Sequence, residues 1–390
     1  MKRSVADIHD CYGCGVCSAA CPIKIIDIGL NDNGFYEPVV VNADRCTDCG
    51  LCRDVCSYVA EPSVPGNAVT GSWAGWSDDV AVRQKCSSGG IGFEICRQLL
   101  ARGYRIVACR YNADTGRAEH FVADNEKSLI EGIGSKYIQS FTPDAFGRLE
   151  RDGRYAIVAA PCQIDSLRRL IERRRMSDNV VLIDFFCHCV PSMLVWKAYL
   201  GSVEAKIGKV TYASWRNKFG YGWHDSWIMS LDNADVTDEE GHDERIAERK
   251  GVYESRMSQG DMFYRLFLGG VAVNPACHES CRFKYDKSSA DIRLGDLWGD
   301  TYAGDEKGVS AVVAFTDKGR DVVKSLEGVT LREHPFEVVA EGQMRGNAPV
   351  KLLQPAVLWL LRHGVGTESL IFKSVLTAQR IVDKIKRILT

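Results

Sequence analysis

Two short runs of apolar residues in the middle of the chain predict buried β-strands. They cover residues 155–160 and 180–186, and each ends directly at a cysteine-containing turn, Pro161-Cys162-Gln163 or Cys187-His188-Cys189. A helix is predicted after the first run because Ile164, Leu167 and Leu170 recur on one helical face. The carboxyl ends of parallel strands meet at one edge of a sheet, where open α/β folds bind ligands. We therefore expect both turns to lie at a functional edge.

Similar patterns extend this domain. Residues 91–100 predict a helix ending near Gly103, residues 104–108 a strand, and residues 291–299 a strand that delivers Asp296 and Trp298 to a turn. The alternation predicts an α/β domain with a mixed or parallel sheet over residues 81–345. A helical C-terminal segment follows over residues 346–390. Its last helix, 369–390, has one apolar stripe, formed by Leu376, Ile381, Ile385 and Leu389. This stripe is compatible with a surface helix packed on the body and with a helix that docks a partner.

The N-terminal region has a different pattern. Apolar runs at 25–28 and 35–40 flank Asn33-Gly34, which predicts a hairpin. This region, residues 1–60, forms an α+β ferredoxin-like module in our interpretation. Residues 61–80 are polar and rich in Pro and Gly, and predict a linker to the second domain.

Eight cysteines define the chemistry of the module. They form two matched runs with the spacing C-x2-C-x2-C-x3-C of two-cluster bacterial ferredoxins, in which the fourth cysteine of each run binds the other cluster. One predicted [4Fe-4S] site is Cys11, Cys14, Cys17 and Cys56, and the other is Cys46, Cys49, Cys52 and Cys21. A disulfide knot and zinc knuckles are the alternatives, and two matched runs favour clusters.

Composition narrows the setting. The chain has 390 residues with 49 basic and 51 acidic side chains, so it presents no strong field for nucleic acid or for a membrane surface. No run of 18 or more apolar residues occurs, which argues against membrane insertion, and we expect a cytoplasmic protein. In a reducing compartment, the 16 cysteines favour metal ligation over disulfides.

A second group of cysteines lies outside the module. Cys162, Cys187, Cys277 and Cys281 are candidates for a third [4Fe-4S] cluster, with Cys189 as a rival to Cys187. Zinc and plain burial as small hydrophobic residues are the alternatives. We expect Cys86, Cys96 and Cys109 to be core or surface residues.

Two further stretches are candidates for cofactor binding. Ser87-Ser88-Gly89-Gly90 precedes a helix, where free backbone N–H groups suit a pyrophosphate, although an ordinary helix cap has the same pattern. Residues 215–223 interleave aromatic side chains with Arg216 and Lys218, as a site for a planar ring and phosphates would. A half-buried strand and turn, or single-stranded nucleic acid binding, are the alternatives there. Residues 232–250 predict a solvated, charged loop or hairpin.

Several of these motifs together resemble the beta subunits of coenzyme F420 hydrogenase and dehydrogenase, a family that also includes hydroxymethyl-chlorophyll and divinyl reductases. The resemblance covers the chain to about residue 330. It rests on motifs in the family's order: Ser87-Ser88-Gly89-Gly90, Gly134-Ser135-Lys136-Tyr137-Ile138-Gln139-Ser140, Pro161-Cys162-Gln163, Cys187-His188, Val190-Pro191, Arg216-x-Lys218 before Gly222-Trp223, Cys277-x3-Cys281 and Gly295-Asp296-x-Trp298-Gly299. Ala159-Ala160 and Cys189 depart from the family's usual Gly-Thr and Gly.

The resemblance implies FAD in the central domain, near an additional [4Fe-4S] cluster, with electrons passing through the ferredoxin clusters. The cofactor-binding residues that it implies are Ser87, Ser88, Gly89, Gly90, Ser135, Lys136, Tyr137, Ser140, Arg216, Lys218, Asp296 and Trp298. His188 is a candidate proton donor beside the flavin, or a residue that orients the Cys187 loop.

Clusters carry single electrons, whereas a flavin exchanges one or two and can transfer a hydride. The sequence therefore predicts an iron-sulfur flavoprotein oxidoreductase that acts on a low-potential two-electron substrate, such as an F420-like deazaflavin or another organic acceptor. A ferredoxin or a redox partner subunit is the expected electron-exchange partner. The alternatives are an electron-transfer subunit without its own substrate and an iron-sulfur sensor.

Overall fold

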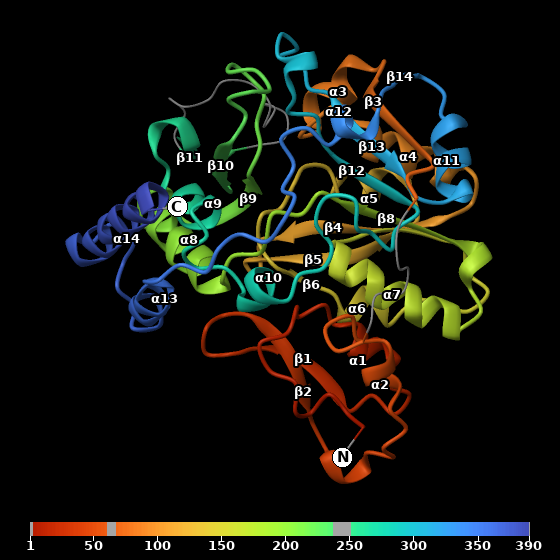
Figure 1. Ribbon diagram of the computed structural model, residues 1–390, viewed down its shortest axis with the longest axis horizontal. Coiled ribbons are helices and arrows are strands. Elements are labelled where there is room, and N and C mark those ends of the chain that lie inside the picture. Colours follow the sequence, from red (N-terminus) through yellow and green to blue (C-terminus); the bar gives the residue numbers. More distant parts are fainter. Residues whose placement is uncertain (1–2, 61–67, 237–250, 390) are drawn as a thin grey trace.

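The computed structural model describes residues 3–60, 68–236 and 251–389. Residues 3–60 form the small module at one end of the molecule, drawn in red in Figure 1. Its helices are α1 (Val16–Ala20) and α2 (Leu51–Asp54), and its strands are β1 (Ile26–Leu30) and β2 (Tyr36–Val40). The strands pair antiparallel with Leu30 opposite Tyr36, which confirms the predicted hairpin, and Gly34 supplies the positive φ of 76° in its turn.

A nine-stranded mixed sheet forms the centre of the main domain. Its order is β14-β3-β13-β12-β8-β7-β4-β5-β6. The pairs β4/β7, β7/β8, β8/β12 and β5/β6 are parallel, and the other four are antiparallel. The strands, in chain order, are β3 (Gly71–Ser77), β4 (Arg105–Asn112), β5 (Arg117–Ala123), β6 (Ser140–Phe141), β7 (Tyr155–Val158), β8 (Val180–Phe185), β12 (Ile292–Asp296), β13 (Ser310–Ala314) and β14 (Val329–Glu333).

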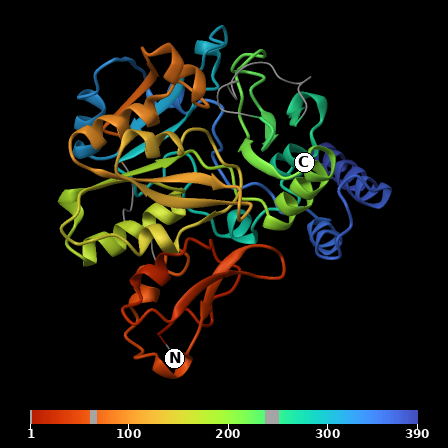
Figure 2. The same cartoon turned by 180° about the vertical axis from the view of Figure 1, so that it is seen from behind.

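Helices cover both faces of this sheet. Alternate residues of one strand point to opposite faces, so Ala156 of β7 packs with the core under α4 (Ile91–Ala101), while Ile157 packs with the core under α7 (Pro161–Arg173). Figures 1 and 2 show these helices on opposite sides of the sheet. Shorter helices complete the layers: α3 (Val80–Lys85), α5 (Glu126–Ile130), α6 (Pro143–Phe146), α11 (Asp317–Lys324) and α12 (Phe336–Val339).

A second, three-stranded sheet of order β11-β10-β9 extends the domain. It packs with several helices around a core that includes Trp196, Trp215, Phe263 and Phe267. The elements are α8 (Met193–Ile207), β9 (Val210–Ser214), β10 (Ile228–Asn233), β11 (Val252–Arg256), α9 (Met262–Leu268), α10 (Pro275–Glu279), α13 (Gln354–Arg362) and α14 (Leu370–Leu389).

Most predicted elements agree with the structure. The strand predicted at 155–160 is β7, the one at 180–186 is β8, and the two are parallel neighbours as expected. The helix predicted at 91–100 is α4, and the strands predicted at 104–108 and 291–299 are β4 and β12. Cys162 and Cys187 therefore follow the carboxyl ends of adjacent strands.

Three predictions need correction. The linker expected over residues 61–80 is wrong from residue 71 onward, because β3 pairs with both β13 and β14 and lies inside the sheet. Gly and Pro content suggested a linker, whereas Trp73 and Ala74 are buried by packing that composition does not reveal. Residues 61–67 lie outside the described chain.

The other two corrections concern surfaces. Asp232, expected to be solvated, is 4% exposed at the end of β10; Asp238, Glu239 and Glu240 lie outside the described residues. In α14 the face against the body is formed by Phe372 and Gln379. Leu376 of the predicted stripe packs partly buried against the same core, whereas Ile381 and Ile385 are half exposed. Within the described ranges, no helix combines the length and apolar character that crossing a bilayer requires.

Candidate redox site

The structure groups the eight module cysteines around two cavities. Cys11, Cys14, Cys17 and Cys56 line the first cavity, and Cys21, Cys46, Cys49 and Cys52 line the second. The fourth cysteine of each run thus faces the cavity of the other run, as the two-cluster ferredoxin pattern predicts. Each cavity offers four sulfur atoms, the donor set of a [4Fe-4S] cluster.

The two groups differ in their exposure to solvent. All four cysteines of the first group are buried, whereas Cys49 of the second is exposed. Burial raises the pKa of Cys11 to about 12 and that of Cys14 to about 11. A thiolate at these positions needs a positive partner to offset its desolvation, and iron would supply one.

The main domain holds the loop of the first group by three backbone carbonyls. Asn274 Nδ2 donates to Cys11 O at 3.0 Å, Gln139 Nε2 to Tyr12 O at 3.1 Å, and Thr142 Oγ1 to Cys14 O at 2.9 Å. The first group therefore faces the main domain, and the second lies on the outer side of the module.

The main-domain cysteines proposed as a third site also gather in one place. Cys162, in the first turn of α7, interacts electrostatically with Cys187, Cys277 and Cys281, and with Cys14 of the module. Cys277 lies within the short helix α10, where a loop was expected. Burial raises the pKa of Cys277 to about 12 and that of Cys162 well above its ordinary value.

Cys189 lies near the same group but has a different packing environment. It interacts with Cys187, Cys277 and Cys281, but unlike Cys187 it is buried in the core of the second sheet. Among the described residues, no three His, Cys, Asp or Glu side chains converge tightly enough to hold a single ion. A cubane spaces its thiolates more widely than one ion does, because each binds a different iron.

Tyr12 connects the first cysteine group with the third. Its hydroxyl donates to Ser280 O, between Cys277 and Cys281, and its ring packs edge-on against Tyr58 and Phe283. Cys14 Sγ lies 3.5 Å from Ser166 Oγ, and Ser57 donates to Cys162 O at 2.9 Å. Sequence reasoning did not single out these residues, because no local pattern marks a contact between positions so far apart.

His188 occupies an apolar position beside the third group. Its ring meets Phe267 edge-on at 5.5 Å. Burial, together with the electrostatic effects of Lys284 and His278, lowers the pKa of His188 to about 4. The imidazole is therefore neutral at physiological pH.

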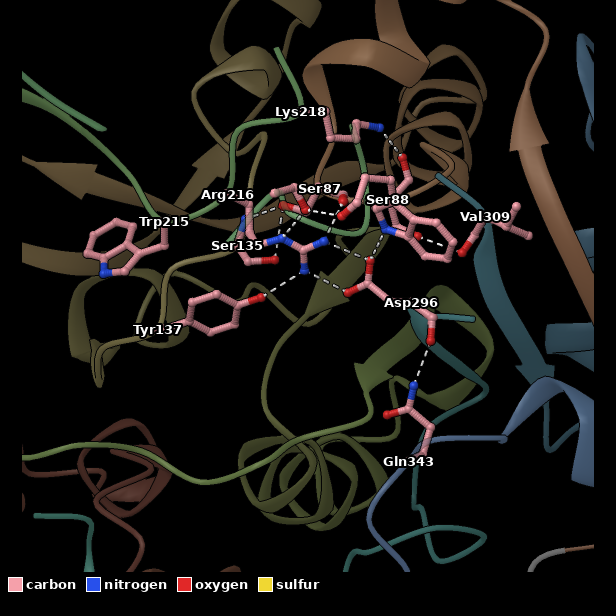
Figure 3. Close-up of polar contacts among 12 residues, drawn as sticks. Ser87, Ser88, Ser135, Tyr137, Trp215, Arg216, Lys218, Asp296, Val309 and Gln343 are labelled. Atoms are coloured by element: carbon pink, nitrogen blue, oxygen red, sulfur yellow. Dashed lines mark hydrogen bonds and ion pairs between the residues drawn. The ribbon is translucent and has the colours of Figure 1, made fainter. Parts of the chain in front are cut away.

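Arg216 is the centre of the other predicted site (Figure 3). Its guanidinium donates to both carboxylate oxygens of Asp296, at 3.0 and 3.3 Å, to the Tyr137 hydroxyl at 3.3 Å, and to Ser87 O at 3.1 Å. Burial lowers the pKa of Arg216, but Asp296 and Tyr137 outweigh that effect, so the pKa is raised overall. Trp223 Nε1 also donates to Asp296, at 2.8 Å.

The serines before α4 are held in the same cluster. Ser87 Oγ accepts a hydrogen bond from the Ser135 amide at 2.9 Å, and Ser88 Oγ donates to Val309 O at 2.7 Å. Lys218 Nζ donates to the carbonyls of Arg83, Ser88 and Lys307, while burial lowers its pKa to about 8. An alanine at Gly89 would place its Cβ 2.3 Å from Gly75 O, so this backbone lies directly against β3.

Aromatic rings surround Arg216. The guanidinium lies 4.8 Å from the ring of Trp227 and 5.1 Å from that of Trp298, and Trp298 stacks on Trp223 at 4.9 Å. On the other side, Trp227 stacks on Tyr137, which stacks on Phe267, the ring that contacts His188. A continuous aromatic column thus runs from the Cys187-His188 turn to the Arg216 cluster.

Two of the predicted cofactor residues have other partners. Lys136 Nζ donates to the carbonyls of Gly132, Ile133 and Gly134 at 2.8–3.1 Å, which closes the turn after α5, and burial lowers its pKa to about 8. Ser140 accepts a hydrogen bond from Gln163, next to Cys162. The structure brings together Ser87, Ser88, Ser135, Tyr137, Arg216, Lys218, Asp296 and Trp298.

Comparisons with known proteins give matches to the N-terminal module and to the main domain. The family model that describes the C terminus of the coenzyme F420 hydrogenase/dehydrogenase beta subunit matches residues 152–336, and the "4Fe-4S dicluster domain" matches residues 10–60. An uncharacterized protein of Methanocaldococcus jannaschii is 23% identical over 223 residues, covering 47% of this chain and 58% of that protein.

Other similarities are shorter or more distant. An iron-sulfur subunit of the CoB–CoM heterodisulfide reductase of the same organism is 34% identical over 67 residues, 14% of this chain and 10% of that protein. The chain therefore spans less than two thirds of the length of either relative.

Among solved structures, a chain of the F420-reducing [NiFe] hydrogenase complex from Methanosarcina barkeri aligns with a TM-score of 0.44 at 16% identity, covering 78% of this chain and 91% of that one. This likeness is distant, and the assignment rests on the family models. The chain therefore carries a 4Fe-4S dicluster domain over residues 10–60 and, over residues 152–336, the C-terminal domain of the coenzyme F420 hydrogenase/dehydrogenase beta subunit.

Proposed function

We propose that this chain is an iron-sulfur flavoprotein oxidoreductase that exchanges single electrons through three [4Fe-4S] clusters and a pair of electrons with an organic substrate at FAD. The observation that carries this proposal is the continuity of the three cysteine groups. The outer group lies next to the inner one, the inner one contacts Cys162 through Ser166 and Ser57, and Cys187 leads to the aromatic column. Such an order suits electron transfer in steps.

The ligands proposed for the ferredoxin clusters are Cys11, Cys14, Cys17 and Cys56 for the inner cluster, and Cys21, Cys46, Cys49 and Cys52 for the outer one. The ligands proposed for the third are Cys162, Cys187, Cys277 and Cys281. Cys187 is preferred over Cys189 because Cys187 interacts with Cys162, whereas Cys189 is buried in the apolar core of the second sheet.

The residues before α4 fit the pyrophosphate of FAD. The helix has 11 residues and Gly90 (φ 90°) is its N-cap, so no side chain caps its first N–H groups and these donors suit an anion. Ser87 and Ser88 add hydroxyl groups, and the aromatic column offers apolar faces for a planar ring. Bound there, FAD would supply the change from one-electron to two-electron chemistry.

A second candidate function is that of an electron-transfer subunit without its own substrate. The exposed Cys49 favours it, because an outer cluster there would be accessible to a redox protein or a partner subunit. Both functions need the three clusters, and only the first needs a flavin and a substrate.

Iron content tests the ligand assignment. We expect about twelve irons per chain after anaerobic purification, four for each cluster, and a loss of about four in Cys162→Ser. Cys189→Ser is the matched control, a buried cysteine of the same neighbourhood, and should keep all the irons. Unchanged iron in Cys162→Ser, or loss of iron in Cys189→Ser but not in Cys187→Ser, would show that the third ligand set is wrong.

Flavin and turnover distinguish the two functions in the same preparation. The oxidoreductase should release FAD on heating in an amount near that of the protein, and it should reduce an organic acceptor with reduced viologen as the donor. A protein loaded with all its clusters that never retains flavin and shows no turnover would favour the electron-transfer subunit.

A further inference from the structure

Lys284 is a buried cation beside the third cysteine group. It follows Cys281 by three residues, is 6% exposed, and donates from Nζ to Cys187 O at 2.7 Å and to His188 O. These two carbonyls belong to the turn after β8 that carries the Cys187 thiol. The ammonium is thus fixed to the turn that presents one of the proposed ligands.

The charge of Lys284 has no acidic counterpart in the described structure. The neighbouring Arg293 is paired with Asp184 at 2.6 Å, whereas none of the ion pairs between described residues joins a carboxylate to Lys284. Removing an ion from water costs several kcal/mol unless an opposite charge or hydrogen bonds compensate it. The partners that the ammonium does have are the carbonyls of Cys187 and His188, which hold it beside the Cys187 thiol.

We infer that Lys284 supplies the fixed positive charge that sets the reduction potential of the third cluster. This inference rests on the proposed function, because it needs the cluster held by Cys162, Cys187, Cys277 and Cys281. Such a cluster becomes more negative when it takes up an electron, and a nearby cation in a medium of low dielectric stabilises that reduced form more than the oxidised form. Lys284 acts through the cluster and is therefore a positioning residue.

The two carbonyl contacts determine how well the charge is placed. A lysine on a flexible stem would turn toward solvent and lose most of its effect, but both acceptors hold Nζ on the inner side of the turn. The inner ferredoxin cluster has no such contact with Lys284 in the described structure. The charge should therefore favour the third cluster as the destination of an electron that enters through the module.

The test is a redox titration of the whole protein with dithionite, followed by electron paramagnetic resonance. Lys284→Gln keeps amide donors for the two carbonyls and removes the charge. We expect the reduction potential of the third cluster to be lower in Lys284→Gln by at least about 59 mV, for one electron. At the potential where this cluster is half reduced in the protein without substitutions, the ratio of reduced to oxidised cluster in the variant should therefore be at least tenfold lower. Lys284→Arg keeps the charge and should stay close to the unchanged protein.

Lys318→Gln is a control for the loss of a lysine bound elsewhere on β8, although Lys318, unlike Lys284, also pairs with a carboxylate, Asp291 at 3.3 Å. Lys318 also donates to two carbonyls, Ser177 O at 3.0 Å and Val180 O at 2.5 Å, but these lie at the beginning of β8, whereas Lys284 lies at its end. Its replacement should leave the potential of the third cluster unchanged. An equal shift in this variant, or a potential of Lys284→Gln that equals that of the unchanged protein at full iron content, would overturn the inference.

Iron analysis separates the remaining outcomes. If the protein without substitutions holds only eight irons per chain, the proposed function is contradicted instead, because there is no third cluster to titrate. If Lys284→Gln loses about four irons per chain, the iron content and the potential of the third cluster are measured in Lys284→Arg instead. Restored iron with the original potential supports the inference, and restored iron with a shifted potential contradicts it.

Discussion

At Arg216 a single guanidinium joins the parts of the predicted flavin site. It contacts two indole rings and bridges Asp296 of β12, Tyr137 and the backbone of Ser87. Arginine suits this position because its planar group stacks on aromatic faces and donates in a fixed fork. The sequence suggested that this cation neutralises a phosphate, but the structure uses its donors to hold the frame of the site.

His120 gives a prediction about pH at the same scale. Its side chain is 5% exposed on β5, one ring nitrogen lies 3.1 Å from Val158 O, and the other has no partner within the described residues. Burial lowers its pKa from 6.5 to about 4. Between about pH 6.5 and pH 4, His120 is therefore protonated in the unfolded chain but neutral in the folded protein. The contribution of the buried neutral His120 to stability is full above pH 6.5 and is lost as the pH falls to about 4.

We expect His120→Gln, which keeps an amide donor for Val158 O, to remove this dependence. Between pH 7 and pH 5 the free energy of unfolding of the unchanged protein should fall by roughly 2 kcal/mol more than that of the variant. Urea unfolding at the two pH values measures the difference. Equal losses in both proteins would mean that His120 is protonated in the folded state.

At the scale of elements, the loop of the inner cysteine group depends on side chains from the main domain. Gln139, which is 3% exposed, accepts a hydrogen bond from the Tyr36 amide at 2.9 Å and donates to Tyr12 O. One side chain thus holds both the ligand loop and β2. The stretch 134–140 was a candidate flavin segment, and this end of it instead joins the module to the main domain.

Gln139→Leu should leave the Tyr36 amide and the Tyr12 carbonyl unpaired, at about 1–3 kcal/mol for each buried group. Amide hydrogen exchange should become faster in residues 11–17 and 36–40. Gln98→Leu is the control, because Gln98 makes the same two bonds with the backbone of Glu327 near the surface on another side of the molecule. Similar exchange of the module in both variants would argue against this role of Gln139.

For the whole molecule, β3 determines where the main domain begins. It pairs with β13 and β14 in antiparallel register, and Trp73 and Ala74 are buried. Without it, β14 has no partner strand and the edge of β13 is unpaired. Residues 71–77 are therefore part of the main domain, although they precede the first residue that the sequence suggested for it.

Truncation tests this boundary. A chain that begins at residue 68 should retain the nine-stranded sheet, whereas a chain that begins at residue 81 should aggregate, because it lacks an inner strand. Circular dichroism and size-exclusion chromatography distinguish the two results. A soluble, folded protein that starts at residue 81 would contradict the role assigned to β3.

The sequence alone determined the features that depend on local spacing. Matched cysteine runs specify two groups of four, Asn33-Gly34 specifies the hairpin, and apolar runs followed by Pro161 and Cys187 specify two parallel strands with thiols at their ends. These signals are local because turn geometry, ligand spacing and strand length are decided within a few residues.

Only the tertiary structure decided which distant residues meet. It placed β3 inside the sheet, held Lys136 and Lys218 on backbone carbonyls, and set Tyr12 and Lys284 beside the third cysteine group. A buried ammonium or amide takes whichever acceptors the fold leaves without a partner, and those acceptors are backbone groups that look the same at every position of a sequence. The partners of such side chains follow from packing between segments, which spacing along the chain does not encode.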